Sequence, residues 1–148
     1  MYQRIVVAVD GSSVSDRALQ AAVDLAREQG GRLRIIHAVD EVTVNLDGEF
    51  TDLDEIQERF CESGVKILER AKAIAQSTGI EVETRLIEIQ TMGHRIADVI
   101  AEDAQSWGAD LIVIGTHGRR GVHRVLLGSV AEGVSRTASV PVLLIRGA

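Results

Sequence analysis

Short apolar runs alternate along the chain with longer stretches in which apolar residues recur at helical spacing. The short runs are rich in Val, Ile and Leu, as is typical of strands buried on both faces of a parallel sheet. In the longer stretches, residues such as Ala18, Ala22 and Leu25 share one face of a helix. The predicted strands are Arg4–Val9, Leu33–Val39, Val82–Ile89, Leu111–Ile114 and Val140–Ile145. The predicted helices begin near Ser13, Asp52, Ile96 and Ser129, and glycines at 30, 79 and 108 follow the first three of them.

Serines stand at two of the predicted helix starts. Ser13, with Asp16 three residues later, fits a capping box, in which each side chain satisfies a backbone N–H group of the first turn. Ser129 follows Gly128 and is the candidate N-cap of the last helix. Both helices are therefore expected to begin directly after a loop that leaves a strand.

Five strands alternating with four helices predict one domain of the α/β class that spans residues 1–148. Its sheet is expected to be parallel and doubly wound, with helices on both faces and right-handed crossovers. In such Rossmann-like sheets, ligands bind outside the carboxyl ends of strands, where the direction of winding reverses. The ends of the strands are therefore the places to look for chemistry.

Composition narrows the classes of function. The 148 residues are 45% hydrophobic but only 3% aromatic, and the net charge is -6, which disfavours base stacking and non-specific attraction to nucleic acid or anionic lipid. No apolar run is long enough to cross a membrane, and no targeting segment is evident, so a cytoplasmic protein is expected. Cys61 is the single cysteine and can form neither an internal disulfide nor a thiolate zinc site. The acidic stretch 40–62 is interpreted as a solvated loop and helix face, and no metal site is predicted.

Two of the strand ends carry candidate chemistry. The first strand is followed by Asp10, and the fourth by a loop that contains Gly115, His117, Gly118 and three arginines. A carboxylate can accept hydrogen bonds from ribose hydroxyls, and the N–H groups of a glycine-rich loop suit phosphate oxygens. If these strands are neighbours, the pair indicates a nucleotide site in which glycines with positive φ permit close approach.

The start of the last predicted helix adds an anion-binding feature to this loop. The N–H groups of Ser129, Val130 and Ala131 are expected to point out of the positive end of the helix dipole. The segment 109–148 has five arginines against two acids, so positive charge is concentrated where phosphate would lie. Two common phosphate motifs are missing, since Lys66 and Lys72 lie within a helix rather than in a P-loop and no dinucleotide fingerprint follows the first strand.

The spacing of these residues resembles the universal stress protein family, specifically its ATP-binding branch. The family signature is glycine, two residues, glycine, nine residues, glycine, and then serine or threonine. The chain reads Gly115-Thr116-His117-Gly118, nine residues from Arg119 to Leu127, and then Gly128-Ser129. The segment 5–12 and the closing strand also resemble the family, so the likeness covers essentially the whole chain.

The resemblance implies a sheet order of 3-2-1-4-5, the order of adenine nucleotide alpha hydrolase-like folds, and a homodimer formed through the last strand. It also implies an ATP site, to which a divalent ion such as Mg2+ would come with the nucleotide. A side chain at position 128 is expected to block the phosphate approach while leaving the fold intact. The residues that the resemblance assigns to the nucleotide are Asp10, Ala38, Val39, Gly115, Thr116, His117, Gly118, Arg119, Gly128, Ser129, Val130 and Ala131.

Together with the phosphate loop, the resemblance implies a stress-response regulator that binds ATP and acts as a nucleotide-dependent switch. No catalytic residue is assigned, because no general base, activating lysine or nucleophile accompanies the phosphate loop, so at most slow hydrolysis is expected. The main alternatives are a slow ATPase and a nucleotide-free interaction module of the same fold. A phosphoacceptor domain would need an aspartate after the third strand and a lysine after the fifth, and the chain has neither. An ATP pyrophosphatase would need a Ser-Gly-Gly loop after the first strand, which is also missing. The downstream partner is not specified by the sequence.

Overall fold

A computed structural model of the chain describes residues 1–40, 53–89, 93, 95–117 and 127–147, with the side chains of residues 40, 53–58 and 60 left out of the description. All nine predicted strands and helices are present, with ends that differ from the predicted ones by a few residues. The strands are β1 (Arg4–Ala8), β2 (Arg32–Asp40), β3 (Glu81–Ile89), β4 (Leu111–Gly115) and β5 (Val142–Ile145). The helices are α1 (Ser13–Gln29), α3 (Leu53–Gln76), α4 (Ile96–Trp107) and α5 (Ser129–Thr137).

The strands form one parallel sheet in the order β3-β2-β1-β4-β5, which confirms both the α/β class and the predicted order. The winding direction reverses between β1 and β4, because β1 leads to β2 on one side while β4 leads to β5 on the other. The carboxyl ends of β1 and β4 therefore meet at the switch point of the sheet.

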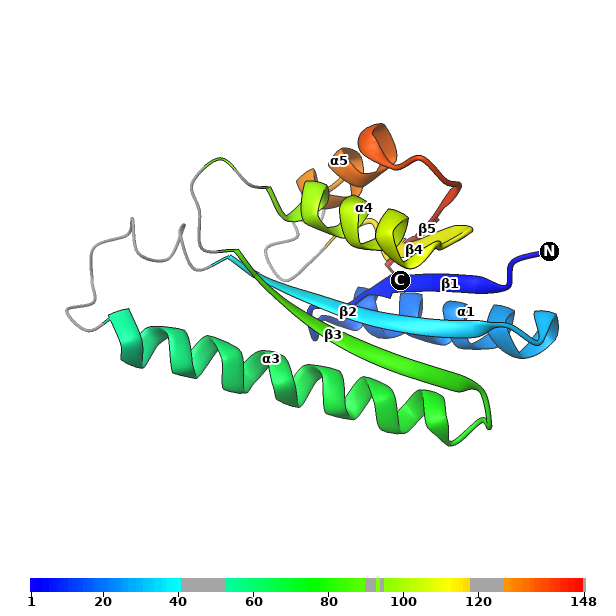
Figure 1. Cartoon of the computed structure of the whole chain (residues 1–148), viewed down its shortest axis with the longest axis horizontal. Helices are drawn as coiled ribbons and strands as arrows, with labels where there is room; N and C mark the ends of the chain where they lie inside the picture. The colour runs from blue at the N-terminus through cyan, green and yellow to red at the C-terminus, as the bar shows by residue number, and fades with distance from the viewer. Residues whose placement is uncertain (41–52, 90–92, 94, 118–126, 148) are drawn as a thin grey trace.

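Two helical layers enclose this sheet, with α1 and α3 on one face and α4 and α5 on the other (Figure 1). β1 shows why both layers are needed, because its successive side chains point to opposite faces. Ile5 and Val7 belong to the core under α1 and α3, whereas Val6 belongs to the core under α4 and α5. Ile5, Val6 and Val7 are fully buried, as the apolar run predicted.

The helix ends agree with the sequence in some places and differ in others. Gly30 and Gly108 adopt the left-handed conformation, with φ of 65° and 81°, and end α1 and α4 as predicted. The N-cap of α1, however, is Ser12 and not Ser13: its Oγ accepts the N–H of Ser15 at 3.2 Å. Ser12 has the extended backbone that a capping residue requires, whereas Ser13 is already helical.

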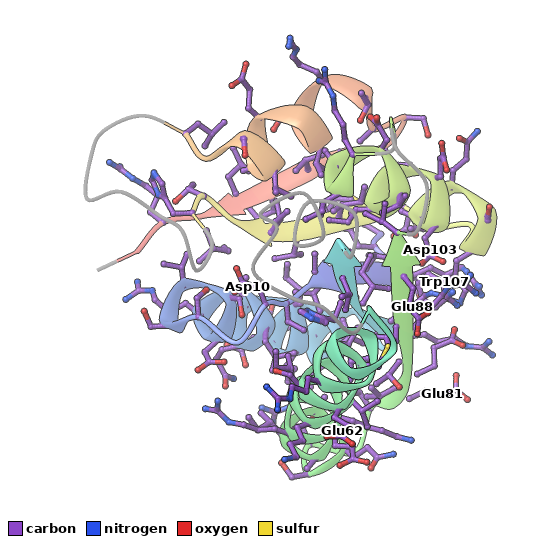
Figure 2. All side chains as sticks on the ribbon, turned by 90° about the vertical axis from the view of Figure 1, so that its left-hand side faces the viewer. Asp10, Glu62, Glu81, Glu88, Asp103 and Trp107 are labelled. Atoms are coloured by element: carbon purple, nitrogen blue, oxygen red, sulfur yellow. The ribbon has the colours of Figure 1, made fainter. Side chains whose placement is uncertain are left out.

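An ion network centred on the buried carboxylate of Asp103 links α4 to strands β2 and β3. The carboxylate of Asp103 accepts two hydrogen bonds from Arg34, each of 2.9 Å, and lies 3.1 Å from Arg85. Its side chain is only 8% exposed. At the end of the same helix the guanidinium of Arg4 lies over the ring of Trp107, 4.3 Å from its centroid (Figure 2).

Among the described residues, none of the helices combines the length and the apolar character of a membrane-spanning segment. The same residues contain no group of three or more His, Cys, Asp or Glu side chains that could hold a metal ion. Cys61 is half-buried on α3, where its Sγ donates to Oε1 of Glu88 at 2.9 Å.

Candidate functional site

The carboxyl edge of the sheet steps inward at β1, because both of its neighbours run further. β1 pairs with β2 only as far as Ala8↔Ile36, whereas β2 continues beside β3 to Asp40↔Ile89. On the other side, β1 pairs with β4 as far as Val7↔Val113, whereas β4 continues beside β5 to Gly115↔Ile145. The chain that leaves β1 therefore turns away between two longer strands.

Asp10 lies in the turn that leaves β1, at the edge that faces the viewer in Figure 2. Its Oδ1 accepts the N–H of Ser12 at 2.9 Å, and its own N–H donates to Oγ of Ser15 at 3.2 Å. Gly11 permits this turn, since its φ of 83° lies in the left-handed region that side chains rarely adopt. The carboxylate is thus held half-buried at the point that the sequence predicted.

Ala38 presents backbone groups to the space that β1 vacates. In a parallel sheet, alternate residues of a central strand bond to opposite neighbours. Arg32 N–H and Ile36 C=O bond toward β1, so the peptide groups of Ala38 point to the same side. Among the described residues, neither its N–H nor its C=O has a hydrogen-bond partner. Val39 points its groups toward β3, and its side chain is buried.

The imidazole of His37 bonds to the carbonyl oxygen of Val9, the acceptor that the register of the sheet would otherwise offer to the Ala38 N–H. Its Nδ1 lies 2.7 Å from the carbonyl oxygen of Val9, and because a carbonyl can only accept, Nδ1 carries the proton. Gly64 of α3 makes room for the ring, since a Cβ at that position would lie 2.9 Å from Cδ2 of His37. His37 thereby fixes the last carbonyl before Asp10.

Gly115 ends β4 and lies against the first turn of α1. A Cβ at this position would lie 2.6 Å from Cγ1 of Val14, so the absence of a side chain lets α1 approach the strand. Its φ is not positive, which corrects the expectation that left-handed freedom explains this glycine. Close packing is the reason for glycine here.

The start of α5 is tied to the end of β4 by Gly128. The N–H of Gly128 donates to the carbonyl oxygen of Thr116 at 2.8 Å, and a Cβ on Gly128 would lie 2.7 Å from the same oxygen. Gly128 is the N-cap of α5, so Ser129 is the first helical residue and not the cap that the sequence indicated. A Cβ on Gly128 would point at the loop that follows β4, at Thr116 and His117, so the expected loss of nucleotide on substitution at 128 stays a prediction.

The first N–H groups of α5 belong to Ser129, Val130 and Ala131, at the positive end of the helix dipole. Beside them, buried Thr116 places its Oγ1 3.1 Å from Nδ1 of His117. Gly118, Arg119 and the arginines at 120 and 124 lie outside the described residues.

The fold thus brings most of the predicted residues to one edge of the sheet: Asp10, Ala38, Val39, Gly115, Thr116, His117, Gly128, Ser129, Val130 and Ala131. Sequence reasoning missed the residues that hold this edge in place, namely Ser12, Ser15 and His37. The bond of His37 to Val9 leaves no periodic signal, because it depends on the register of β1 and β2. The bonds of Ser12 and Ser15 are local, but they depend on the residue at which α1 begins.

Three kinds of comparison agree on the family of this chain. The family model of the universal stress protein family matches residues 1–146. The universal stress protein YxiE of Bacillus subtilis is 36% identical over 154 aligned positions, which cover 99% of this chain and 100% of that protein. A universal stress protein from Archaeoglobus fulgidus solved in complex with dAMP is 31% identical, with a TM-score of 0.67 and coverage of 97% and 98% of the two chains. A universal stress protein solved in complex with cAMP is 27% identical, with a TM-score of 0.69 and coverage of 98% and 97%.

Proposed function

The chain belongs to the universal stress protein family, and from that premise we propose that it binds ATP at the edge where β1 stops short and that this occupancy is its signal. The proposal includes a homodimer, a cytoplasmic location and at most slow hydrolysis. The two complexes with cAMP and dAMP support an adenine nucleotide as the ligand class.

The step in the sheet is the single observation that carries the proposal. Between β2 and β4 the N–H and C=O of Ala38 have no partner among the described residues, and Asp10 lies at the same edge of the sheet. Adjacent backbone donor and acceptor groups match the hydrogen-bonding edge of adenine, and a carboxylate suits the ribose hydroxyls. Unpaired peptide groups are costly inside a protein, so a ligand that satisfies both gains binding free energy.

The phosphates are assigned to the start of α5. Gly128 holds this helix start against Thr116, so the N–H groups of Ser129, Val130 and Ala131 lie at the same edge as Asp10. Each charge-assisted hydrogen bond to a phosphate oxygen contributes about 1.5–3 kcal/mol. Such a site binds an anion without a P-loop lysine, and a Mg2+ ion would arrive on the phosphates and not on a protein cluster.

The dimer is assigned to β5, which is an edge strand of the sheet. Its four residues are apolar, and Leu143 is 37% exposed. An apolar edge strand with unpaired backbone groups favours association with a second copy. Pairing of this kind would link two nucleotide sites through the neighbouring strand β4.

The test begins with the small molecules that the purified protein releases on denaturation, identified by mass spectrometry. Titration calorimetry of ATP, ADP, AMP and cAMP into stripped protein then measures the affinity for each, with and without Mg2+. We expect saturable binding with a preference for ATP. The absence of binding by every adenine nucleotide would favour the interaction-module alternative, and a preference for AMP or cAMP would contradict the phosphate assignment alone.

Asp10→Asn supplies the matched variant for this titration. It removes the carboxylate charge but keeps an oxygen to accept the Ser12 N–H, so the turn is preserved. We expect the affinity for ATP to fall about tenfold, the equivalent of one hydrogen bond to a charged group, with little change in thermal stability. Asp24→Asn, on the exposed face of α1, is the control and should leave the affinity unchanged.

A further inference from the structure

The first turn of α1 carries both groups that hold Asp10. The N–H of Ser12 donates to the Asp10 carboxylate, and the Oγ of Ser15 accepts the N–H of Asp10. The residue before Asp10 is joined to β2, because Val9 donates its N–H to a carbonyl of that strand and accepts a hydrogen bond from His37. The position of Asp10 is therefore tied to β2 and to the first turn of α1.

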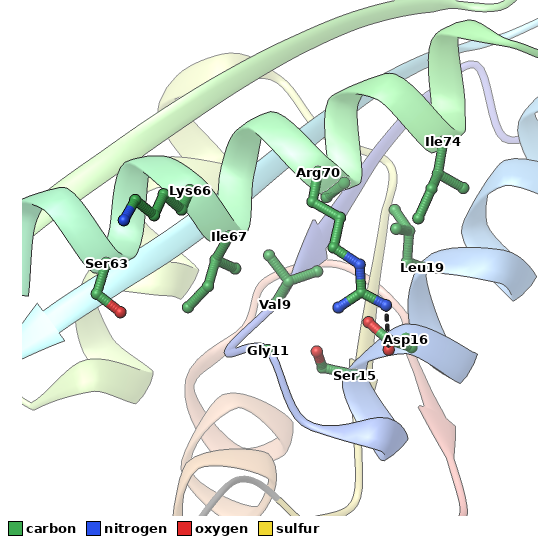
Figure 3. Close-up of a pocket in the computed structure, with 11 residues that line it drawn as sticks. Val9, Gly11, Ser15, Asp16, Leu19, Ser63, Lys66, Ile67, Arg70 and Ile74 are labelled. Atoms are coloured by element: carbon green, nitrogen blue, oxygen red, sulfur yellow. Dashed lines mark hydrogen bonds and ion pairs between the residues drawn. The ribbon is translucent and has the colours of Figure 1, made fainter.

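On the side of α3, the packing of this first turn is incomplete. A groove of about 260 Å³ lies between α1 and α3, with Gly11 and Ser15 among the residues that line it (Figure 3). Arg70 of α3 reaches Asp16 of α1, with 3.2 Å between Nη2 and Oδ2, but the two side chains are 65% and 44% exposed. Exposed ion pairs of this kind contribute little to stability. The position of the turn therefore depends on the contacts that it makes on its other side.

Val14 makes these contacts, because it packs against the ends of β4 and β5. A Cβ on Gly115, the last residue of β4, would lie 2.6 Å from Cγ1 of Val14. A Cβ on Gly147, two residues after β5, would lie 3.1 Å from its Cγ2. A valine in a helix strongly favours one χ1 rotamer, so neither methyl group can swing aside at low cost. The two methyl groups therefore fix the distance between the first turn of α1 and these strand ends.

The strand end that Val14 contacts also positions α5. Gly115 is followed by Thr116, whose carbonyl oxygen accepts the N–H of Gly128 at 2.8 Å. Gly128 is the N-cap of α5, so the start of this helix follows the end of β4. The proposed nucleotide edge thus has two parts: a base part, formed by Ala38 and Asp10, and a phosphate part, formed by the N–H groups of residues 129–131. The contact between Val14 and Gly115 lies between the two.

We propose that Val14 is a positioning residue that sets the spacing between the base part and the phosphate part, and that it thereby favours ligands that contact both. This inference rests on the proposed function. ATP contacts both parts, so its affinity depends on their spacing, because hydrogen bonds weaken steeply when their geometry is disturbed. Adenosine contacts the base part alone, which is held to β2 through Val9, so its affinity does not depend on Val14.

The test compares the affinities for ATP and adenosine by titration calorimetry. Gly115→Ala places a Cβ 2.6 Å from Cγ1 of Val14, whereas ordinary contacts begin near 3.4 Å, so the turn and the strand end must move apart by up to about 0.8 Å. We expect the affinity for ATP to fall about fivefold or more and the affinity for adenosine to change less than about twofold. Val14→Ala adds no clash and should lower the affinity for ATP about threefold, again without affecting adenosine.

The double variant Val14→Ala/Gly115→Ala should regain most of the affinity for ATP. The obstructing methyl group is then gone, and the new Cβ lies 3.4 Å from both the carbonyl carbon and the Cβ of residue 14, which is an ordinary contact. Gly31→Ala is the matched control, because its Cβ would lie 2.9 Å from the carbonyl oxygen of Gln3, at the opposite edge of the sheet. This control should lower the melting temperature and leave the affinity for ATP unchanged.

The outcomes distinguish this inference from the proposed function. If the parent chain binds neither ATP nor adenosine, the proposed function is wrong and the inference is wrong with it. If the parent binds both, the positioning role of Val14 is overturned when Gly115→Ala and Val14→Ala weaken ATP and adenosine equally, or weaken neither. It is also overturned when the double variant binds ATP no better than the two single variants, or when Gly31→Ala loses as much affinity for ATP as Gly115→Ala.

Discussion

Gly128→Ala is the most informative single change, because it perturbs the contact between the start of α5 and Thr116, the residue after β4, with one methyl group. The added Cβ would lie 2.7 Å from the carbonyl oxygen of Thr116, whereas ordinary contacts begin near 3.4 Å. The start of α5 must therefore move by about 0.7 Å, the difference between these two distances. No side chain can yield instead, because the obstacle is backbone.

The size of the effect follows from two losses. Overpacking of this kind costs about 1–3 kcal/mol, and weakening the 2.8 Å hydrogen bond from Gly128 to Thr116 costs about 1 kcal/mol. A total of about 2–4 kcal/mol lowers the melting temperature by roughly 4–16 °C in a domain of this size. The first N–H groups of α5 move as well, so the affinity for ATP is expected to fall about tenfold or more.

Gly133→Ala separates loss of stability from loss of the site. Gly133 is on the same helix, where a Cβ would lie 2.5 Å from Cβ of Ala97 on α4. This change should cost similar stability but leave the N–H groups at the helix start in place. Melting curves and ATP calorimetry on both variants provide the comparison. If Gly128→Ala binds ATP like the parent, or if Gly133→Ala loses as much affinity, the start of α5 does not hold the phosphates.

Three further predictions follow from other contacts. His37→Leu removes the donor to the Val9 carbonyl and should reduce the ATP affinity, measured by calorimetry, several-fold. His37→Asn, whose amide nitrogen can replace Nδ1, should bind ATP like the parent, and equal affinities of the two variants would refute the role of this hydrogen bond. Asp103→Ala should lower the free energy of unfolding in urea by about 3 kcal/mol, because two arginines lose a buried carboxylate, whereas Arg32→Ala, in an exposed ion pair, should cost less than about 1 kcal/mol. Leu143→Glu should convert the dimer to a monomer in analytical ultracentrifugation, and a parent chain that is already monomeric would contradict the β5 interface.

The order and type of the elements could be predicted because they depend on local patterns. The run Arg4–Val9 is apolar on both faces, and its strand in the structure is fully buried at three successive residues, Ile5, Val6 and Val7. The glycines at 30 and 108 end their helices as expected, since the left-handed conformation that ends a helix strongly favours glycine. Such signals need only a few neighbouring residues.

The details of the candidate site depend on the exact backbone conformation or on partners far along the chain, and could not be predicted in the same way. Ser12 and Ser13 are chemically identical, and only the backbone conformation decides that Ser12 caps α1. The glycine at 115 was correctly placed at the edge of the sheet, but glycine is needed there because of close packing against Val14, about 100 residues earlier in the chain. His37 carried no signal at all, because its acceptor on Val9 is defined by the pairing of β1 with β2.

Side chains replace the missing strand partners at the point where β1 ends, and this explains how a turn can serve as a binding site. His37 donates to the carbonyl of Val9, Ser15 accepts the N–H of Asp10, and the Asp10 carboxylate accepts the N–H of Ser12. Each bond has a net value of about 1 kcal/mol, so together they hold the turn without a ladder. A ligand then meets Asp10 already in position and loses less conformational entropy on binding. The affinity of this edge should therefore depend on His37 and Ser15 even though the nucleotide is assigned to neither.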